Sequence, residues 1–166
     1  MLKPDFTIDR LRELISYDPI IGDMFWKTQH TNRIVVGQKI NGKMKLGHLR
    51  VGINRKRYLA HRIAWFHYYG KWPTKNLDHK DGNAGNNAID NLRECTQAQN
   101  LWNRNVQCNN LVSLKGVSRD NRRGTWFSRI CVKGKIHFLG KFNTPEEAHQ
   151  AYIKAAKKLH GEFARY

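Results

Sequence analysis

The pattern of hydrophobic and polar positions predicts a helix and then a group of strands in the N-terminal part of the chain. The helix follows Thr7, a residue type that caps helix N-termini, and ends before Asp18-Pro19. Its apolar positions recur at helical spacing: Ile8, Leu11, Leu14 and Ile15. Between residues 24 and 61, short apolar runs alternate with turn signals, the strongest being Asn41-Gly42 and Asn54-Arg55-Lys56. We therefore expect an antiparallel layer with a hairpin turn at Asn41-Gly42.

A second helix and a polar loop follow this layer. Residues 61–69 are almost continuously apolar, and Gly70 with Pro73 ends the run, which predicts a buried helix. Residues 78–87 are polar and rich in turn-forming residues, and residues 91–95 have the composition of a short strand. Thr96 with Gln99 three residues later is a capping box, which predicts the start of another helix.

The pattern loses its period after this helix and then resumes. Residues 103–110 are polar and aperiodic, which predicts a linker at 106–114 between a unit of residues 1–105 and a unit of residues 115–166. In the second unit, alternation around turns at residues 120–124 and 133–135 predicts three antiparallel strands. The segment 144–147, Thr-Pro-Glu-Glu, predicts the start of a helix. That helix carries one apolar stripe: Ala148, Ala151, Tyr152, Ala155, Ala156 and Leu159. The expected fold class is α+β.

The charge of the chain indicates the kind of partner. Its 166 residues include 30 Lys and Arg against 13 Asp and Glu, a formal net charge of +17. The excess is shared, since residues 1–110 hold 18 basic and 9 acidic side chains and residues 111–166 hold 12 and 4. Lys and Arg that face phosphates release condensed counterions, so such an excess favours a polyanion. It excludes an ordinary neutral metabolic enzyme and makes nucleic acid the expected partner of both units.

The lengths of apolar runs and the spacing of cysteines indicate the cellular compartment of the chain. No apolar run approaches the roughly 20 residues that cross a bilayer, and the N-terminal residues lack the apolar stretch of a signal peptide. Cys95, Cys108 and Cys131 are too widely spaced for a Cys-x-x-Cys zinc knuckle. We expect reduced thiols, a cytoplasmic protein, no membrane partner and no obligate protein partner.

Candidate chemistry is concentrated at the polar loop. Asp78 directly precedes His79, so in an extended segment their side chains point to opposite sides. The carboxylate of Asp78 and the amide oxygen of Asn100 form a hard, sparse ligand set that suits Mg²⁺ or Mn²⁺ better than Zn²⁺. An imidazole with an ordinary pKa of about 6.5 can accept a proton from water near neutral pH. The sequence therefore predicts metal-assisted attack of water on a phosphate, with His79 as the base.

These residues carry a family resemblance. Asp78, His79, Asn91 and Asn100, within residues 60–100, resemble the HNH endonucleases of phages and mobile introns in order and spacing. The resemblance implies a ββα-metal active site in which His79 is the general base, Asp78 and Asn100 hold one Mg²⁺ or Mn²⁺ ion, and Asn91 braces the loop that aims His79. It also implies products with a 5′-phosphate and a 3′-hydroxyl. Asn100 stands where the family often has a His, a variant of the intron-type subgroup.

Other interpretations apply to the same loop and to the other histidines. A plain surface loop would use the same Asp, Gly and Asn residues, because turns favour them. An EF-hand calcium loop is excluded, because Lys80 and Gly82 stand at positions that need oxygen ligands. His61 precedes an apolar helix and is interpreted as a hydrogen-bonded core residue. The remaining histidines show no metal-ligand spacing and are interpreted as surface or packing residues: His30, His48, His67, His137, His149 and His160.

The strands of the second unit carry the expected DNA contacts. These side chains mix guanidinium, ammonium and aromatic groups, which suits phosphates and base edges: Arg119, Arg122, Arg123, Trp126, Arg129, Lys133, Lys135 and Lys141. Strand alternation places Ser128 and Ile130 on one face with Trp126, and Arg129 on the other face. A solvated basic face, or a core role for Trp126, is the competing interpretation.

The second unit also has a family resemblance. Gly116-Val117, Gly124-Thr125-Trp126 and the segments 138–142, 144–148 and 151–161 resemble the AP2/ERF DNA-binding domain. In that family a three-stranded sheet lies in the major groove of double-stranded DNA and a helix supports it from behind. The combined hypothesis is a site-specific, homing-type endonuclease that nicks DNA as a monomer. The main alternative is a sequence-specific DNA-binding regulator with an inactive nuclease unit, and a weaker one is an RNA-binding protein.

Overall fold

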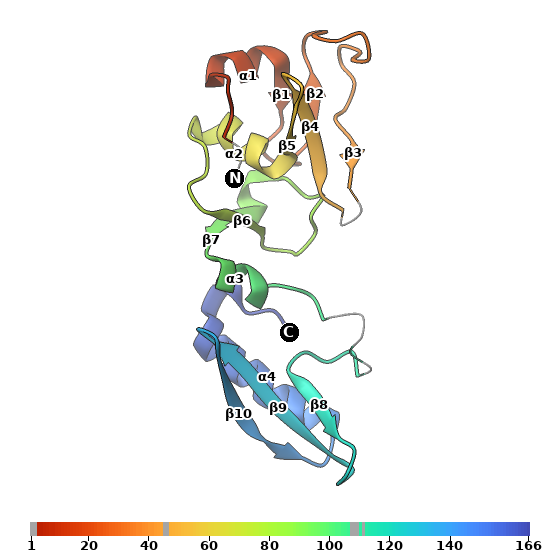
Figure 1. Cartoon of the computed structure of the whole chain (residues 1–166), viewed down its shortest axis with the longest axis vertical. Coiled ribbons are helices and arrows are strands. Elements are labelled where there is room, and N and C mark those ends of the chain that lie inside the picture. Colours follow the sequence, from red (N-terminus) through yellow and green to blue (C-terminus); the bar gives the residue numbers. More distant parts are fainter. Residues whose placement is uncertain (1–2, 45–46, 107–109, 111) are drawn as a thin grey trace. The chain divides into compact units, whose positions relative to one another are not determined.

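The chain forms two compact units, and its fold class is α+β, as the sequence predicts. The computed structural model describes residues 3–44, 47–106, 110 and 112–166 (Figure 1). The units are Met1–Thr96 and Gln97–Tyr166. Cys108 and residues 107–109 and 111 of the expected linker lie outside the described residues. Among the helices of the described ranges, none is both long and apolar enough to span a membrane.

The first unit places short strand pairs around two helices. Its elements are α1 (Ile8–Leu14), β1 (Ile15–Tyr17), β2 (Met24–Trp26), β3 (Gly42–Lys43), β4 (Leu49–Ile53), β5 (Lys56–Leu59), α2 (Ala60–Tyr69), β6 (Asn76–His79), the 3-10 turn η1 (Ile89–Asn91) and β7 (Leu92–Cys95). Strand pairing is antiparallel, in the orders β1-β2, β3-β4-β5 and β6-β7. The Thr7 hydroxyl caps α1 by accepting the backbone N–H of Arg10, as expected.

Two hairpin turns show where the sequence pattern succeeded and failed. Asn54 and Arg55 have φ values of 51° and 61° between β4 and β5, the left-handed pair that a tight two-residue turn requires. The expected turn at Asn41-Gly42 is wrong, because Gly42 lies within β3 and pairs with Arg50 of β4. Pairing along β4 has overridden the local preference of this dipeptide for a turn.

Apolar side chains of α1, α2 and the strands make one core in the first unit. Leu11 and Leu14 of α1, Val51 and Ile53 of β4, and Ile63 of α2 are all fully buried in it. α2 carries Gly70 at φ 67° as its left-handed C-cap, which confirms the predicted buried helix and its end. The direct connection of β5 to α2 therefore fixes the first turn of this helix against the core.

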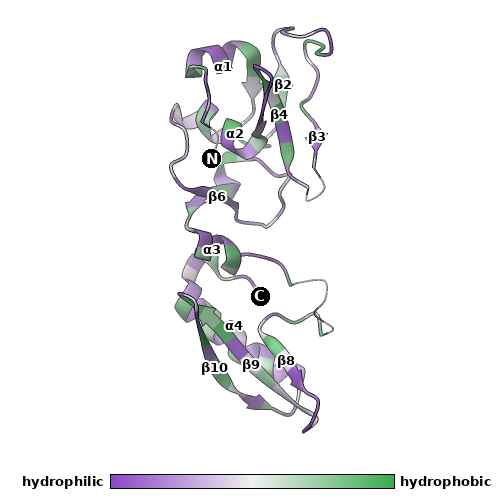
Figure 2. Cartoon of the chain, in the orientation of Figure 1, coloured by the Kyte–Doolittle hydropathy of each residue, from purple (hydrophilic) through white to green (hydrophobic). Residues whose placement is uncertain are grey.

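The second unit is a three-stranded sheet with a helix packed on one face. Its elements are α3 (Gln97–Trp102), β8 (Val117–Asp120), β9 (Thr125–Val132), β10 (Lys135–Phe142), α4 (Pro145–His160) and the 3-10 turn η2 (Gly161–Phe163). The antiparallel strands have the order β10-β9-β8. Both strands β9 and β10 carry hydrophobic and hydrophilic residues (Figure 2). Burial alternates in β9, where Ser128 and Ile130 are buried whereas Arg129 is exposed. The expected capping box is present, since Thr144 and Glu147 cap each other's backbone.

The apolar stripe of α4 differs from the expectation at one position. Ala148, Tyr152 and Ala156 are buried against the sheet, but Leu159 is 41% exposed. The four-residue spacing of this stripe continues to His160, which is buried instead. His160 contacts the backbone oxygen of Cys131 through Nε2 at 3.1 Å, and its ring stacks on Trp102. At the end of the stripe, buried His160 with its polar contact thus takes the place that the sequence pattern predicts for Leu159.

Candidate active site

The strand pair β6–β7 positions the two adjacent polar residues of the loop entrance. Asp78 pairs with Arg93 and His79 pairs with Leu92 across the ribbon. The guanidinium of Arg93 donates from Nε at 3.0 Å and from Nη2 at 2.9 Å to Oδ2 of Asp78. Asp78 and His79 are each 5% exposed. A buried carboxylate is thus held by a guanidinium on the strand beside it.

Hydrogen bonds from side chains of α2 and β7 fix the segment that leads into this ribbon. The buried guanidinium of Arg62 on α2 donates to the backbone oxygens of Pro73 and Lys75, at 2.9 and 3.2 Å. Oε1 of Glu94 on β7 accepts the backbone N–H groups of Thr74 and Lys75, at 2.7 and 3.1 Å. These charge-assisted bonds limit the freedom of the segment that leads into β6.

Asn91 closes the loop that follows His79. Its amide donates to Oδ1 of Asp81 at 3.0 Å and to the backbone oxygen of Asn86 at 2.9 Å, and its Oδ1 accepts the backbone N–H of Asp81. Burial alone would raise the pKa of Asp81, but hydrogen bonds from the Asn83 backbone, Asn86 and Asn91 lower it. Asn91 therefore lies at the base of the loop. Its role in aiming His79 stays a prediction.

A buried amide contacts the imidazole of His79. Oδ1 of Asn87, a residue 1% exposed, lies 3.4 Å from Nε2 of His79. An amide oxygen only accepts, so this contact requires a proton on Nε2 and leaves the lone pair on Nδ1. The backbone oxygen of Asn87 accepts the hydroxyl of Tyr17 at 2.7 Å, which ties the loop to β1. Asn87 thus favours the tautomer of His79 that carries its proton on Nε2.

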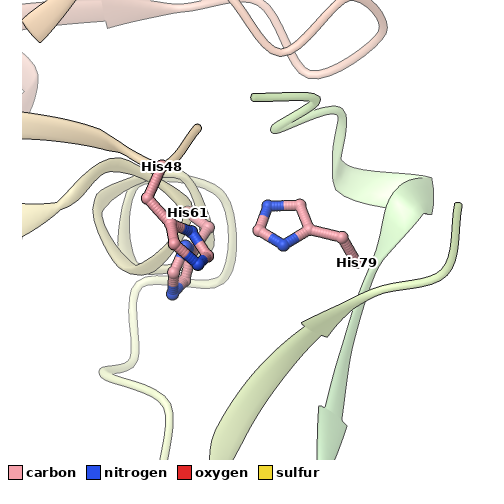
Figure 3. Close-up of side chains that lie close together, drawn as sticks. All are labelled: His48, His61 and His79. Atoms are coloured by element: carbon pink, nitrogen blue, oxygen red, sulfur yellow. The ribbon is translucent and has the colours of Figure 1, made fainter. Parts of the chain in front are cut away.

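Three imidazoles gather at this point. His79 reaches from the end of β6 toward His61 in the first turn of α2 and toward His48, which precedes β4 (Figure 3). One ring nitrogen from each residue lies within 4.8 Å of the other two. Burial lowers the pKa of His61 to about 3, with the neighbouring rings contributing. Burial also lowers the pKa values of His48 and His79, although the Asn87 contact acts in the opposite direction on His79.

No sequence pattern groups these histidines. The sequence favours a core role for His61 and a surface or packing role for His48, whereas the structure brings both against His79. The three residues are separated along the chain by strand and helix, so no spacing motif links them. The start of an apolar helix at a histidine was the one local signal, and it favours a packed residue equally.

The expected metal ligands belong to different units. Asp78 offers a buried carboxylate oxygen, the donor type that Mg²⁺ prefers, and this donor fits such an ion. Asn100 lies half-buried on α3, in the second unit. Its meeting with Asp78 stays a prediction.

The expected DNA-contacting residues occupy three parts of the second unit. Arg129 and Lys141 are exposed on the outward face of the sheet, away from α4, with Phe127 and Phe138 beside them. Four more are exposed at the hairpin turns: Arg122, Arg123, Lys133 and Lys135. Arg119 and Trp126 pair across the strands on the other face, with the guanidinium 5.6 Å from the ring centroid. The eight residues therefore do not form one continuous face.

Comparison with known proteins places the chain in a family. The HNH endonuclease model matches residues 58–101, and the AP2 domain model matches residues 112–162. Protein 3.8 of Escherichia phage T7 is 36% identical over 90 residues, 54% of this chain and 74% of that protein. The chain belongs to the HNH endonucleases. An uncharacterized HNH endonuclease of Acanthamoeba polyphaga mimivirus is 33% identical over 88 residues, 53% of this chain and 44% of that protein.

Membership in this family makes the chain a DNA-cleaving hydrolase, and its AP2 domain is a second DNA-binding element. The match of the HNH model contains the β6–β7 ribbon with its loop and ends within α3. The match of the AP2 model contains the sheet and all of α4. The sequence-based limits of the two domains, 1–105 and 115–166, stay predictions.

Proposed function

We propose that this HNH endonuclease cuts DNA site-specifically, in the manner of a homing enzyme, and nicks one strand as a monomer. The observation that carries the proposal is the His79 ring, buried at the end of β6 with Nε2 against the amide oxygen of Asn87. This contact orients the lone pair of Nδ1 for taking a proton. Burial also lowers the pKa of His79, so the ring is neutral near pH 7.

The reaction follows from that neutral imidazole. His79 accepts a proton from a water molecule, and the water oxygen attacks the phosphorus of the scissile diester. The bond from phosphorus to the 3′-oxygen breaks, and the leaving oxygen takes up a proton. The products carry a 5′-phosphate and a 3′-hydroxyl. Asn91 supports this step by holding the loop closed behind the base.

Asp78 and Asn100 would hold the Mg²⁺ or Mn²⁺ ion of this site. The ion, when bound, stabilises negative charge on the leaving oxygen. Because Arg93 donates two hydrogen bonds to Asp78, it keeps the carboxylate oriented and its charge balanced before the ion binds.

The AP2 domain would select the DNA target. Its exposed cations suit phosphates, and Arg129 lies beside Phe138, which is 61% exposed. Arg recognises guanine through two acceptors in the major groove, and aromatic side chains contact thymine methyl groups. A rigid sheet with both kinds of side chain on its outward face therefore supports sequence reading.

A plasmid assay tests the function. The purified chain is incubated with supercoiled plasmid carrying its own genomic neighbourhood, in Mg²⁺ or in chelator, beside His79→Ala and the control His30→Ala. The parent and the control should convert supercoiled to open circular DNA only in Mg²⁺, and His79→Ala should be nearly inactive. Labelling of the nicked ends checks for a 5′-phosphate. Equal activity of parent and His79→Ala would remove the base from its role.

A DNA-binding regulator without cleavage is the second candidate. The observation that favours it is the ion pair between Arg93 and Asp78, which engages the carboxylate expected to hold the metal. Tight binding by the parent without any nicking in Mg²⁺ or Mn²⁺ would support the regulator. An Mg²⁺-dependent nick that His79→Ala abolishes would exclude it.

A further inference from the structure

We infer that His48, His61 and His79 form a second metal site, one for a borderline ion such as Zn²⁺, and that an ion bound there switches the nuclease off. The inference rests on the proposed role of His79 as the base. It concerns a different ion and different ligands from those expected at Asp78 and Asn100. The cluster is composed of nitrogen donors, whereas the catalytic ion is expected to bind oxygen.

The geometry of the cluster suits a small tetrahedral ion. Nitrogen ligands at the usual Zn–N distance of about 2.1 Å lie roughly 3.4 Å from one another. The ring nitrogens here are within 4.8 Å, and the ring centroids are 5.1 to 5.7 Å apart. His61 lies in a helix and His79 in a strand. His48 lies outside both kinds of element, directly before β4, and is half-buried. Movement of the three ring nitrogens toward one another would close the remaining gap.

The surroundings of the rings also favour an ion. Nδ1 of His48 is buried and has no hydrogen-bond partner among the residues that the structure describes. Such a buried nitrogen loses its solvation without compensation, and a metal bond or a bound water would restore it. Three imidazoles suit Zn²⁺, Ni²⁺ or Cu²⁺, whereas Mg²⁺ binds oxygen ligands. With three protein ligands, the fourth position would stay open to water or to a phosphate oxygen.

Binding of the ion would oppose catalysis through His79. A metal on Nδ1 would use the lone pair that takes the proton from water. A metal on Nε2 would displace the contact with Asn87 that sets the tautomer. Either way the ring leaves its role as base, so Zn²⁺ should inhibit cleavage that Mg²⁺ supports.

Calorimetric titration of the full chain with Zn²⁺ tests the site itself. The variant is His48→Gln, because His48 lies outside the proposed catalytic groups, and the matched control is His30→Gln in the same unit. The parent and the control should bind one ion with equal affinity, and His48→Gln should bind it at least about tenfold more weakly. Circular dichroism checks that both variants fold. Equal affinity of His48→Gln and parent would overturn the site.

Cleavage in saturating Mg²⁺ tests the switch. Zn²⁺ should inhibit the parent and His30→Gln at concentrations at which His48→Gln keeps its activity. Support of cleavage by Zn²⁺, or equal inhibition of all three proteins, would overturn the inference. If the parent does not cleave at all, the proposed function fails, and the calorimetric comparison still decides whether the three histidines bind the ion.

Discussion

The two units differ in whether their candidate functional side chains are buried or exposed. The first unit buries polar groups at its candidate site: His61, Arg62, Asp78, His79 and Asn87. The second unit exposes its candidate DNA contacts, with Arg129 and Lys141 on the outward face of the sheet. Hydrolysis needs a few groups fixed in position and shielded from bulk solvent, because electrostatic effects are then strong. Phosphate contact needs cations that the nucleic acid can reach.

The apolar cores of the two units also differ, in size. The first unit has a large apolar cluster that includes Leu11, Ile53 and Ile63 and extends to Leu92 of the ribbon. The second unit has a smaller cluster, centred on Ile130, Tyr152 and Ala156. Buried polar groups cost free energy unless each is paired, and the unit that buries more of them also has the larger apolar core. Variants that separate the two roles are therefore the way to challenge this division.

Loss of the Asn87 amide should produce the largest difference between the effect on cleavage and the effect on DNA binding. Asn87→Ala removes the acceptor that sets the tautomer of His79, so kcat should fall about 10²- to 10³-fold, or roughly 3 to 4 kcal/mol. DNA affinity should stay unchanged, because the AP2 domain is untouched. Single-turnover cleavage and a gel-shift titration measure the two quantities. Asn32→Ala, in an exposed loop of the same unit, is the control. A parallel loss of binding and cleavage would contradict the division.

A pair of glycines tests how tightly the first unit holds its active-site loop. Gly22 and Gly37 both have positive φ, 79° and 82°. A Cβ at Gly22 would lie 2.3 Å from the backbone nitrogen of Ala88 and 2.4 Å from the carbonyl carbon of Asn87, whereas a Cβ at Gly37 meets nothing within 4 Å. Gly37→Ala should cost about 1 kcal/mol of unfolding free energy through backbone strain alone. Gly22→Ala should cost about 3 kcal/mol, because the clash with backbone adds to that strain.

Urea unfolding followed by tryptophan fluorescence measures this pair. Cleavage should fall in Gly22→Ala and stay at the parent level in Gly37→Ala, since only the first position touches the segment that contacts His79. Equal destabilisation by both substitutions would mean that the loop yields to the added methyl group.

Elements that depend on local signals were predicted well from the sequence. Thr7 caps α1, and Thr144 with Glu147 caps α4, because capping requires only residues close in the chain. The hairpin at Asn41-Gly42 was wrong because the register of β3 against β4 depends on distant residues. The prediction that Leu159 is buried was wrong for a similar reason. His160 is buried instead, because its ring contacts the backbone oxygen of Cys131 on β9, a residue distant in the chain.

The candidate site divides in the same way. Asp78, His79 and Asn91 are close in the chain and carry a family pattern, so their place at one loop was predictable. The partners of His79 were not, because Asn87 resembles any turn residue and His48 and His61 carry no shared spacing. Arg93 was also missed, although strand pairing places it opposite Asp78. Such partners follow from register and packing.

Removal of sheet cations should have a moderate effect confined to binding. Arg129→Ala or Lys141→Ala should weaken DNA binding roughly tenfold and lower the slope of log affinity against log salt by about 1, because one phosphate contact is lost. Cleavage at saturating DNA should be unchanged. Lys154→Ala, an exposed cation on α4, is the control. Gel-shift titrations at several salt concentrations give the slope, and a slope unchanged in both sheet variants would deny these contacts.

Acid should destabilise the first unit at a higher pH than the second. This is the smallest of the expected effects. In the described residues, burial lowers the pKa of His48, His61, His67 and His79 in the first unit, and of His160 in the second. A lowered folded-state pKa means that the unfolded chain binds the proton first, so the stability from neutral imidazoles is complete above pH 6.5 and decreases as the pH falls below it. His61, with a pKa of about 3, should alone cost about 1 kcal/mol between pH 6.5 and 5.5. Hydrogen exchange in chelator, resolved by mass spectrometry, should show earlier loss of protection in α2 and β6 than in β9, and simultaneous loss would mean that the two units are equally sensitive to protonation.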